Sequence, residues 1–293
     1  METLLVLAFD NLSSFDQGRI RKGLRQVEGL LAQICLSSPT TAAEKRRSVI
    51  DPGKEPPPPP RSLQELSGDP AFREFFKLQD NFQWNVTAQL LNSLDRLLSK
   101  NNDGAMEILI IQTLNLIQGT LLVHPPSRGL FQREMYMNHL LDLLEPDMCP
   151  AVQSSTIITL VCALIEAPQN ARTFERLDGL MMITSVFKSR ETTREVKLKL
   201  VEFLYFYLMP ETPSIPSANA TASVPAMLQR SPSKLAGAFN RADSAARKRA
   251  DSESGITRTT DEKQVLLSKH LPNVEDLVVD LREAQAAFGG DLN

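Results

Sequence analysis

The amino-acid sequence predicts an all-α protein: an armadillo/HEAT-like helical repeat array with two disordered segments and a C-terminal docking helix. Three observations lead to this fold class. Apolar residues recur at three- and four-residue spacing along most of the 293 residues, as they do on one face of a helix. A set of apolar positions repeats at a constant offset. Two low-complexity segments, 37–61 and 211–260, interrupt the helical pattern.

The repeat relates residues 131–164 to residues 174–207. A period of about 40–47 residues with two or three helices per unit is typical of armadillo and HEAT repeats. Chance is the alternative, because leucine is common and all amphipathic helices resemble one another. Seven apolar positions match at an offset of 43 residues: Phe131 with Phe174, Leu140 with Ile183, Leu143 with Val186, Leu144 with Phe187, Ile157 with Leu200, Leu160 with Phe203 and Leu164 with Tyr207. A weaker copy lies upstream, with Leu94, Leu97 and Leu98 at an offset of 46 from Leu140, Leu143 and Leu144.

Residues 1–36 are predicted to contribute the N-terminal helix of the array. A basic amphipathic helix can lie on an anionic membrane. We favour a terminal repeat helix that docks on the core and leaves its charges in solvent. The apolar stripe consists of Ile20, Leu24, Val27, Leu30, Leu31 and Ile34, beside Arg19, Arg21, Lys22 and Arg25.

Residues 37–61 are predicted to be a disordered, proline-rich linker. Five consecutive prolines, 56–60, favour an extended polyproline II conformation that does not join a packed core. Docking of a proline-recognition domain is the alternative to a stiff linker.

Residues 62–210 are predicted to form the armadillo-like repeats. Asp69 and Pro70 have the chemistry of a helix start, with a capping carboxylate followed by proline at the first position. Helices are expected at about 104–123, 126–145 and 149–166. The aromatic residues at the start of this region are expected in the core: Phe72, Phe75, Phe76, Phe82 and Trp84.

The stretch 170–210 has the clearest helix-start and helix-stop signals in the chain. We expect a short helix, a turn at Asp178-Gly179 and a second helix that ends at Lys188. The polar residues 189–192 supply capping chemistry for a third helix. Pro210 stops that helix, because proline lacks the amide donor and its ring clashes with the preceding turn.

The last two segments differ in their apolar content. Residues 211–260 contain few aromatic residues and many Ser, Thr and Pro, so they cannot bury enough apolar surface to offset their ordering entropy. We predict that they are disordered. Residues 261–293 are predicted to form a helix that caps the array, because its apolar stripe is unstable alone. That stripe comprises Val265, Leu266, Leu267, Leu271, Val274, Leu277, Val278 and Leu281.

The composition excludes several classes of protein. A net charge of −3 gives no electrostatic reason to expect nucleic-acid binding. No window approaches 18 apolar residues, so no transmembrane segment is expected, and METLLVLAFD lacks the basic region of a secretory signal. Cys35, Cys149 and Cys162 have no short spacing, which indicates a reducing compartment rather than disulfides or zinc. We therefore expect a cytosolic or nuclear protein.

The sequence contains no pattern that predicts catalysis. It has only three histidines and no GxxxxGK[ST], GxGxxG or HExxH motif. A cysteine-based phosphatase needs arginine six residues after its nucleophile. Thr41, Ser155 and Pro168 occupy that position after the three cysteines. We therefore predict a protein that is not an enzyme and has no catalytic residues, cofactor or metal.

Binding is the remaining function, and the helix before Pro210 is the best candidate for it. Val196, Leu200, Phe203 and Tyr207 fall on one side of this helix, and Leu198, Glu202, Tyr205 and Met209 on the opposite side. A helix that is apolar on both faces is buried on both or lines the partner-binding surface of a repeat array. We expect Leu198 and Met209 to be buried and Arg194, Glu202 and Tyr205 to contact a partner.

Four segments of the chain, 20–37, 78–86, 174–211 and 263–289, together resemble one family. Their sequences are IRKGLRQVEGLLAQICLS, LQDNFQWNV, FERLDGLMMITSVFKSRETTREVKLKLVEFLYFYLMPE and KQVLLSKHLPNVEDLVVDLREAQAAFG. They are similar to the fungal cell division control protein fourteen family of the septation initiation network, which is unrelated to the phosphatase of that name.

The resemblance implies a non-catalytic partner that activates a protein kinase of the germinal-centre class and works with other septation-network proteins. It would act in the cytoplasm and at the spindle pole body, promoting septum formation and cytokinesis. No catalytic residues carry over from the family. The alternative is an adaptor, at a membrane surface or within the spindle pole body, that does not activate a kinase directly.

Four serines are candidates for phosphorylation. Ser231 precedes a proline, the context of proline-directed kinases, and Ser48 follows three residues, 45–47, that are all basic. Ser244 and Ser252 each end the tetrapeptide Arg-Ala-Asp-Ser, which chance also explains in a segment rich in these residues. Each phosphate adds roughly −1.5 to −2 charge near pH 7. We expect phosphorylation at Ser231, Ser244 or Ser252 to tune partner binding or pole-body recruitment without changing the fold.

Overall fold

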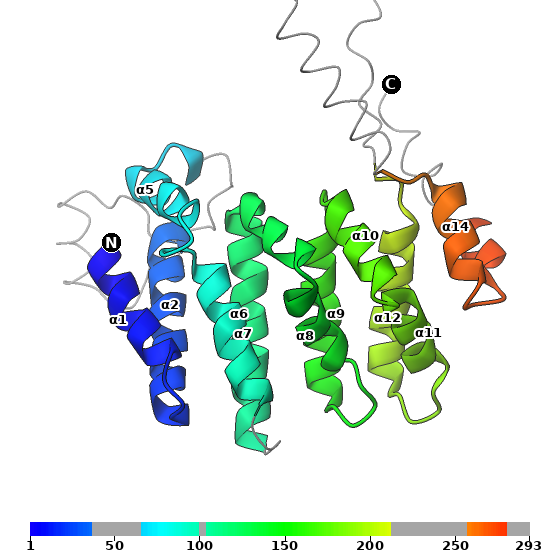
Figure 1. Cartoon of the computed structure of the whole chain (residues 1–293), viewed down its shortest axis with the longest axis horizontal. Helices are drawn as coiled ribbons and strands as arrows, with labels where there is room; N and C mark the ends of the chain where they lie inside the picture. The colour runs from blue at the N-terminus through cyan, green and yellow to red at the C-terminus, as the bar shows by residue number, and fades with distance from the viewer. Residues whose placement is uncertain (37–65, 100–103, 212–256, 280–293) are drawn as a thin grey trace, which may run out of the picture.

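The computed structural model describes residues 1–36, 66–99, 104–211 and 257–279 (Figure 1). Within these ranges the chain forms helices and turns without a strand, so the all-α prediction is confirmed. The elements in chain order are α1 (Glu2–Leu12), α2 (Gln17–Leu36), α5 (Pro70–Gln79), α6 (Val86–Leu98), α7 (Gly104–Val123), the 3-10 helix η1 (Pro125–Gln132), α8 (Glu134–Asp142), α9 (Pro150–Leu164), α10 (Pro168–Arg176), α11 (Gly179–Lys188), α12 (Arg194–Leu208) and α14 (Thr260–Ser268).

The long helices form one layer. They contact each other in the order α2, α7, α9 and α12, and α14 packs against α12 at the end of the row. The second layer consists of α1, α6, α8 and α11, each against its neighbour in the first. Figure 1 shows the pairs following one another along the longest axis, with the N-terminus at one end and α14 at the other. Every long helix of the first layer therefore has one side that faces away from the second.

The positions matched at an offset of 43 lie in the core. Thirteen of the fourteen residues are buried, and the exception, Phe187, is half-buried against the core. The matched segments are η1 with α10, α8 with α11 and α9 with α12. The periodicity in the sequence thus marks equivalent inward-facing positions in two successive groups of three helices.

Buried polar side chains connect successive groups. The Asn85 amide donates to Ser127 Oγ at 2.8 Å, and the Gln118 amide donates to Thr159 Oγ1 at 2.9 Å. The Asn170 amide donates to the carbonyl of Arg128 at 2.8 Å. Because a buried amide is costly to leave unpaired, these bonds favour one register between neighbouring groups.

Helix starts follow the sequence with two corrections. Asp69 caps α5 as predicted, since its carboxylate accepts from the Ala71 amide at 2.8 Å. The cap of α12 is Thr193, one residue beyond the predicted polar stretch 189–192. The single helix predicted over 126–145 is wrong, because Arg133 adopts an extended conformation that separates η1 from α8.

The N-terminal region differs from the prediction in having two helices. The stripe of α2 is buried as expected, apart from the half-buried Leu31, so this helix docks on the core. The apolar run at the start forms a helix of its own, α1, which the sequence analysis missed. Phe82 was expected in the core and is exposed, where its ring lies 6.0 Å from the Arg133 guanidinium.

Helix α7 is long and apolar enough to cross a membrane by length and composition, with a mean hydropathy of 1.5. The helix was predicted from the sequence, but its length and hydropathy were not recognised there as sufficient to span a membrane. In the structure the helix lies between α6 and α9, and Gln118 bonds the side chain of Thr159. These contacts are those of a core helix.

Several predicted segments reach beyond the described residues, among them the last part, 280–293, of the predicted C-terminal helix. The linker 37–61 lies entirely outside them. The predicted disordered segment 211–260 lies outside them except at its ends, where the boundaries require correction. Glu211 and residues 257–260 are part of the described structure, and α14 already begins at Thr260.

Candidate partner-binding surface

The first layer presents a stripe of exposed residues on three consecutive helices. On α7 the stripe is Ile108, Asn115 and Leu122, at seven-residue spacing. The same spacing recurs along and just beyond α9 and α12, at positions shifted by 43 and then 44 residues. The equivalent exposed residues are Ala151, Ile158 and Ile165 on α9, and Glu195, Glu202 and Met209 on α12. Five of these nine side chains are large and apolar, although they face solvent.

The three residues predicted to contact a partner all lie on α12. Arg194 begins the helix and is exposed. Glu202 is 54% exposed and accepts from Lys199 Nζ at 2.8 Å. Tyr205 is half-buried against the core. Their roles in binding stay predictions.

The expectation that Leu198 and Met209 are buried is wrong. They are 59% and 47% exposed and share the exposed side of α12 with Glu202. The reason is tertiary: α9, α11 and α14 pack against α12, and Leu198 and Met209 lie on the part of its surface that these helices leave exposed. The exposed side of α12 is therefore more apolar than the sequence analysis assumed.

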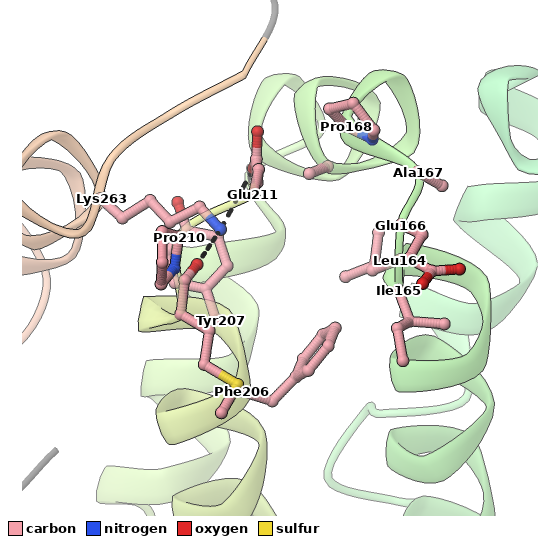
Figure 2. A pocket seen from close by; sticks show the side chains of 12 residues that line it. Leu164, Ile165, Glu166, Ala167, Pro168, Phe206, Tyr207, Pro210, Glu211 and Lys263 are labelled. Carbon is pink, nitrogen blue, oxygen red and sulfur yellow. Dashed lines mark hydrogen bonds and ion pairs between the residues drawn. The ribbon is translucent and has the colours of Figure 1, made fainter. Parts of the chain in front are cut away.

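A groove runs between α9 and α12. Its middle part encloses about 250 Å³ and is lined by Ile157, Ile158, Val161, Lys199, Glu202, Phe203 and Phe206. A second hollow of about 220 Å³ lies at the ends of these helices, between the residues that follow α9 and those that follow α12. Phe206 lines both hollows, so the two lie next to each other along α12, and we call them together the α9–α12 groove. Figure 2 shows Phe206 projecting from α12 toward Leu164 and Ile165.

A cluster of charges closes the far end of this groove, where α14 meets α10 and α12. Glu175 Oε2 lies 2.7 Å from the Arg258 guanidinium. Glu211 accepts from Arg172 and lies 3.1 Å from Lys263 Nζ, and both carboxylates are almost buried. Figure 2 shows Lys263 reaching from α14 toward Glu211 above Tyr207. We call Arg172, Glu175, Tyr207, Glu211, Arg258 and Lys263 the ionic cluster.

Burial shifts the pKa of two members of the cluster. It raises the pKa of Tyr207 far above its ordinary value, and the negative charge of Glu175 adds to the shift. The hydroxyl thus stays protonated and donates to Glu175 Oε1 at 2.7 Å. Burial also lowers the pKa of Lys263, whereas the carboxylate of Glu211 opposes this shift. Lys263 additionally donates to the carbonyl of Met209 at 2.8 Å.

The sequence analysis did not find the ionic cluster. Arg172 and Glu175 are three residues apart on α10, but Glu211 and Lys263 come from far along the chain. No local spacing reports such a cluster.

The described residues hold no group of three His, Cys, Asp or Glu side chains arranged for a metal ion. Burial raises the pKa of the Cys35 and Cys162 thiols, which keeps both protonated and unreactive. The candidate phosphorylation sites Ser48, Ser231, Ser244 and Ser252 lie outside the described residues.

Comparisons with known proteins identify relatives of the chain. The profile of the family described as "Cell division control protein 14, SIN component", in which SIN is the septation initiation network, matches residues 1–287. The chain is 30% identical over 294 aligned residues to "Cell division control protein 14" of Schizosaccharomyces pombe. That alignment covers 97% of this chain and 96% of the relative. No solved structure matches the chain significantly.

Proposed function

Because this chain belongs to the family of cell division control protein 14, a component of the septation initiation network, we propose that it is a non-catalytic scaffold for a protein kinase of the germinal-centre class. In this role it binds and activates the kinase, and so promotes septum formation and cytokinesis. It acts with other proteins of the network, in the cytoplasm and at the spindle pole body.

The observation that carries this proposal is the exposed stripe on α7, α9 and α12. Exposed apolar patches of this kind mark surfaces that bind other proteins. Repeat arrays use such a continuous surface because every unit presents an equivalent position. We propose that the fold is an armadillo-like repeat array. The offset of 43 between buried positions and the polar bonds between successive helix groups support this interpretation.

The test is reconstitution of the purified chain with the catalytic domain of a germinal-centre-class kinase from the same network. The proposal predicts a stable complex and a higher rate of substrate phosphorylation than the kinase shows alone. Binding without a change in rate would limit the function to localising the kinase. Absence of a complex at micromolar concentrations would refute the scaffold role.

Recruitment is proposed to depend on phosphorylation of Ser48, Ser231, Ser244 or Ser252. A chain with all four serines replaced by alanine should fold normally but change its timing at the spindle pole body or its affinity for the kinase. Unchanged timing and affinity in live cells and in a binding assay would remove this part of the proposal.

A second candidate function is a membrane-surface adaptor. One observation favours it: Leu4, Val6 and Leu7 are exposed on α1. Helix α2 adds the exposed basic residues Lys22 and Arg25. Flotation of the purified chain with liposomes of anionic lipid separates the two functions, since only the adaptor should float. A structural subunit of the pole body would instead give a stoichiometric assembly throughout the cell cycle.

A further inference from the structure

The groove between α9 and α12 has the residue spacing of a helix–helix contact. On α9 and at its C-cap, Ile158, Val161 and Ile165 follow one another at steps of three and four residues. On α12 and at its C-cap, Glu202, Phe206 and Met209 follow at steps of four and three. Such steps produce the seam along which a further helix packs. Among the described residues, α10 and α14 line only one end of this groove, and its middle part is lined by α9 and α12 alone.

We propose that the α9–α12 groove is the docking site for an amphipathic helix of the partner, with apolar residues at positions i, i+4 and i+7 and a Lys or Arg beside Glu202. The proposal deepens the proposed function and rests on it in assigning this helix to the bound kinase. It commits to one kind of occupant on three grounds: backbone chemistry, length and charge.

Backbone chemistry favours a helix over an extended peptide. The walls of the middle part of the groove are two α-helices, whose amides and carbonyls bond within each helix. An extended peptide lying between them would leave its own backbone groups without partners. A helix brings its backbone groups already paired and offers only side chains, as in other helix-in-groove complexes.

The length of the groove fits about ten residues of helix. From Lys199 to Met209 the wall extends about 15 Å at the rise of an α-helix. Apolar residues at i, i+4 and i+7 of the partner span about 10 Å, which matches the step from Ile158 to Ile165. The middle hollow would take the first of these side chains, and the hollow beside Phe206 and Met209 the last.

Charge favours a basic residue in the partner helix near the middle of the groove. Glu202 and Lys199 form an ion pair, but the Glu202 side chain is 54% exposed and the Lys199 side chain only 33%. The group that an incoming helix meets there is therefore the carboxylate. At the other end, the Lys263 side chain is only 5% exposed and is paired with Glu211. The ionic cluster therefore closes this end of the groove and does not present Lys263 to a partner.

The experiment uses the full chain and two probes. The first probe is a display library of peptides of about 14 residues, with apolar residues fixed at i, i+4 and i+7 and all other positions random. Peptides selected on the wild-type chain are expected to carry Lys or Arg at one fixed place. Their affinity should fall at least about tenfold for Ile158→Glu and for Met209→Glu. The control is Met181→Glu on α11, equally exposed but in the other layer, which should change affinity less than about twofold.

Charge reversal provides a second variant that does not alter the core. Glu202→Lys should weaken the selected peptides, and replacing their basic residue by Glu should restore binding. If no selected peptide loses affinity with the groove variants, or if the charge swap restores nothing, the docking site is refuted.

The second probe is the kinase, and it separates this inference from the proposed function. Selected peptides should compete with the kinase for the chain. A groove that binds peptides while the kinase binds nowhere would refute the scaffold role alone. A kinase whose affinity is the same for wild-type and groove variants would refute the groove as its docking site and leave the scaffold role standing.

Discussion

Glu211 and Arg258, 47 residues apart in the sequence, are joined by one backbone–backbone and one backbone–side-chain hydrogen bond. The Glu211 amide donates to the Arg258 carbonyl at 3.2 Å, and the Arg258 amide donates to Glu211 Oε2 at 2.9 Å. This contact joins the residue after Pro210 to the segment that leads into α14. The C-terminal helix is thereby fixed to the end of α12 at the same place where the groove ends.

Replacing Glu211 by alanine should destabilise the protein strongly. Lys263, almost fully buried, would lose its carboxylate partner, and removal of one member of a buried ion pair costs about 3–5 kcal/mol. Urea unfolding followed by circular dichroism measures the change. Glu202→Ala is the control, because its pair with Lys199 is exposed and should contribute less than about 1 kcal/mol. Equal losses in the two variants would contradict a structural role for the ionic cluster.

Gly179→Ala should also destabilise the fold. A Cβ at this position would lie 2.3 Å from the nearest carbon of the Phe174 ring. That ring is fully buried against Phe203 and Tyr207, so it cannot move aside freely. We expect a loss of about 1–3 kcal/mol in thermal or urea unfolding.

Gly29→Ala on α2 is the matched control for this substitution. A Cβ there would meet nothing within 4 Å. Alanine in the interior of a helix should therefore gain about 0.5–1 kcal/mol. A shift of the unfolding midpoint in the same direction for both variants would contradict a steric clash at Gly179.

His124 should make the stability depend on pH just below neutrality. The ring is buried, which lowers its pKa below the ordinary 6.5 despite the contact with Asp80 at 3.2 Å. Between the folded and unfolded pKa values the unfolded state binds more protons, so stability rises with pH in that window. The contribution is complete above the ordinary pKa and is lost as the pH falls below it, by at most about 1.4 kcal/mol per unit.

Unfolding free energies measured from about pH 7.5 to 5.5 test this dependence. His124→Asn should be less stable overall, since the bond from Nδ1 to Ser127 Oγ at 2.8 Å is disturbed. It should also show a flatter pH profile than the wild type. Identical slopes for the two proteins would exclude His124 as the source.

Deleting residues 265–289 should lower the melting temperature. In the described part of this range, 265–279, four apolar side chains are buried: Leu267, Leu271, Val274 and Val278. Each contributes about 1.5–3 kcal/mol before the ordering entropy is subtracted. Val265→Ser is the control, because Val265 is exposed and should tolerate a polar residue. A deletion variant that melts at the wild-type temperature would show that the C-terminal helix does not stabilise the array.

The groove could be predicted only in part. The residue Glu202 was identified because it interrupts an apolar side of the helix before Pro210. Leu198 and Met209 were expected in the core and are exposed. The sequence does not show whether a neighbouring helix covers an apolar side chain or leaves it exposed. The groove also needs α9, about 40 residues earlier, and Lys263, about 60 residues later, so no local pattern contains it.

The sequence by itself determined most of the helices and their order, apart from α1 and the division between η1 and α8. Apolar periodicity, a helix start such as Asp69-Pro70 and a helix stop such as Pro210 depend on residues within one or two turns. They can therefore be recognised without knowledge of distant residues. The resemblance of four segments also determined the family. Only the tertiary structure decided which side of α12 is open and that five charged residues converge with Tyr207 at the end of the groove. Burial and ion pairing depend on which distant segments meet in space, and that information lies in the packing of the helices rather than in the spacing along any one of them.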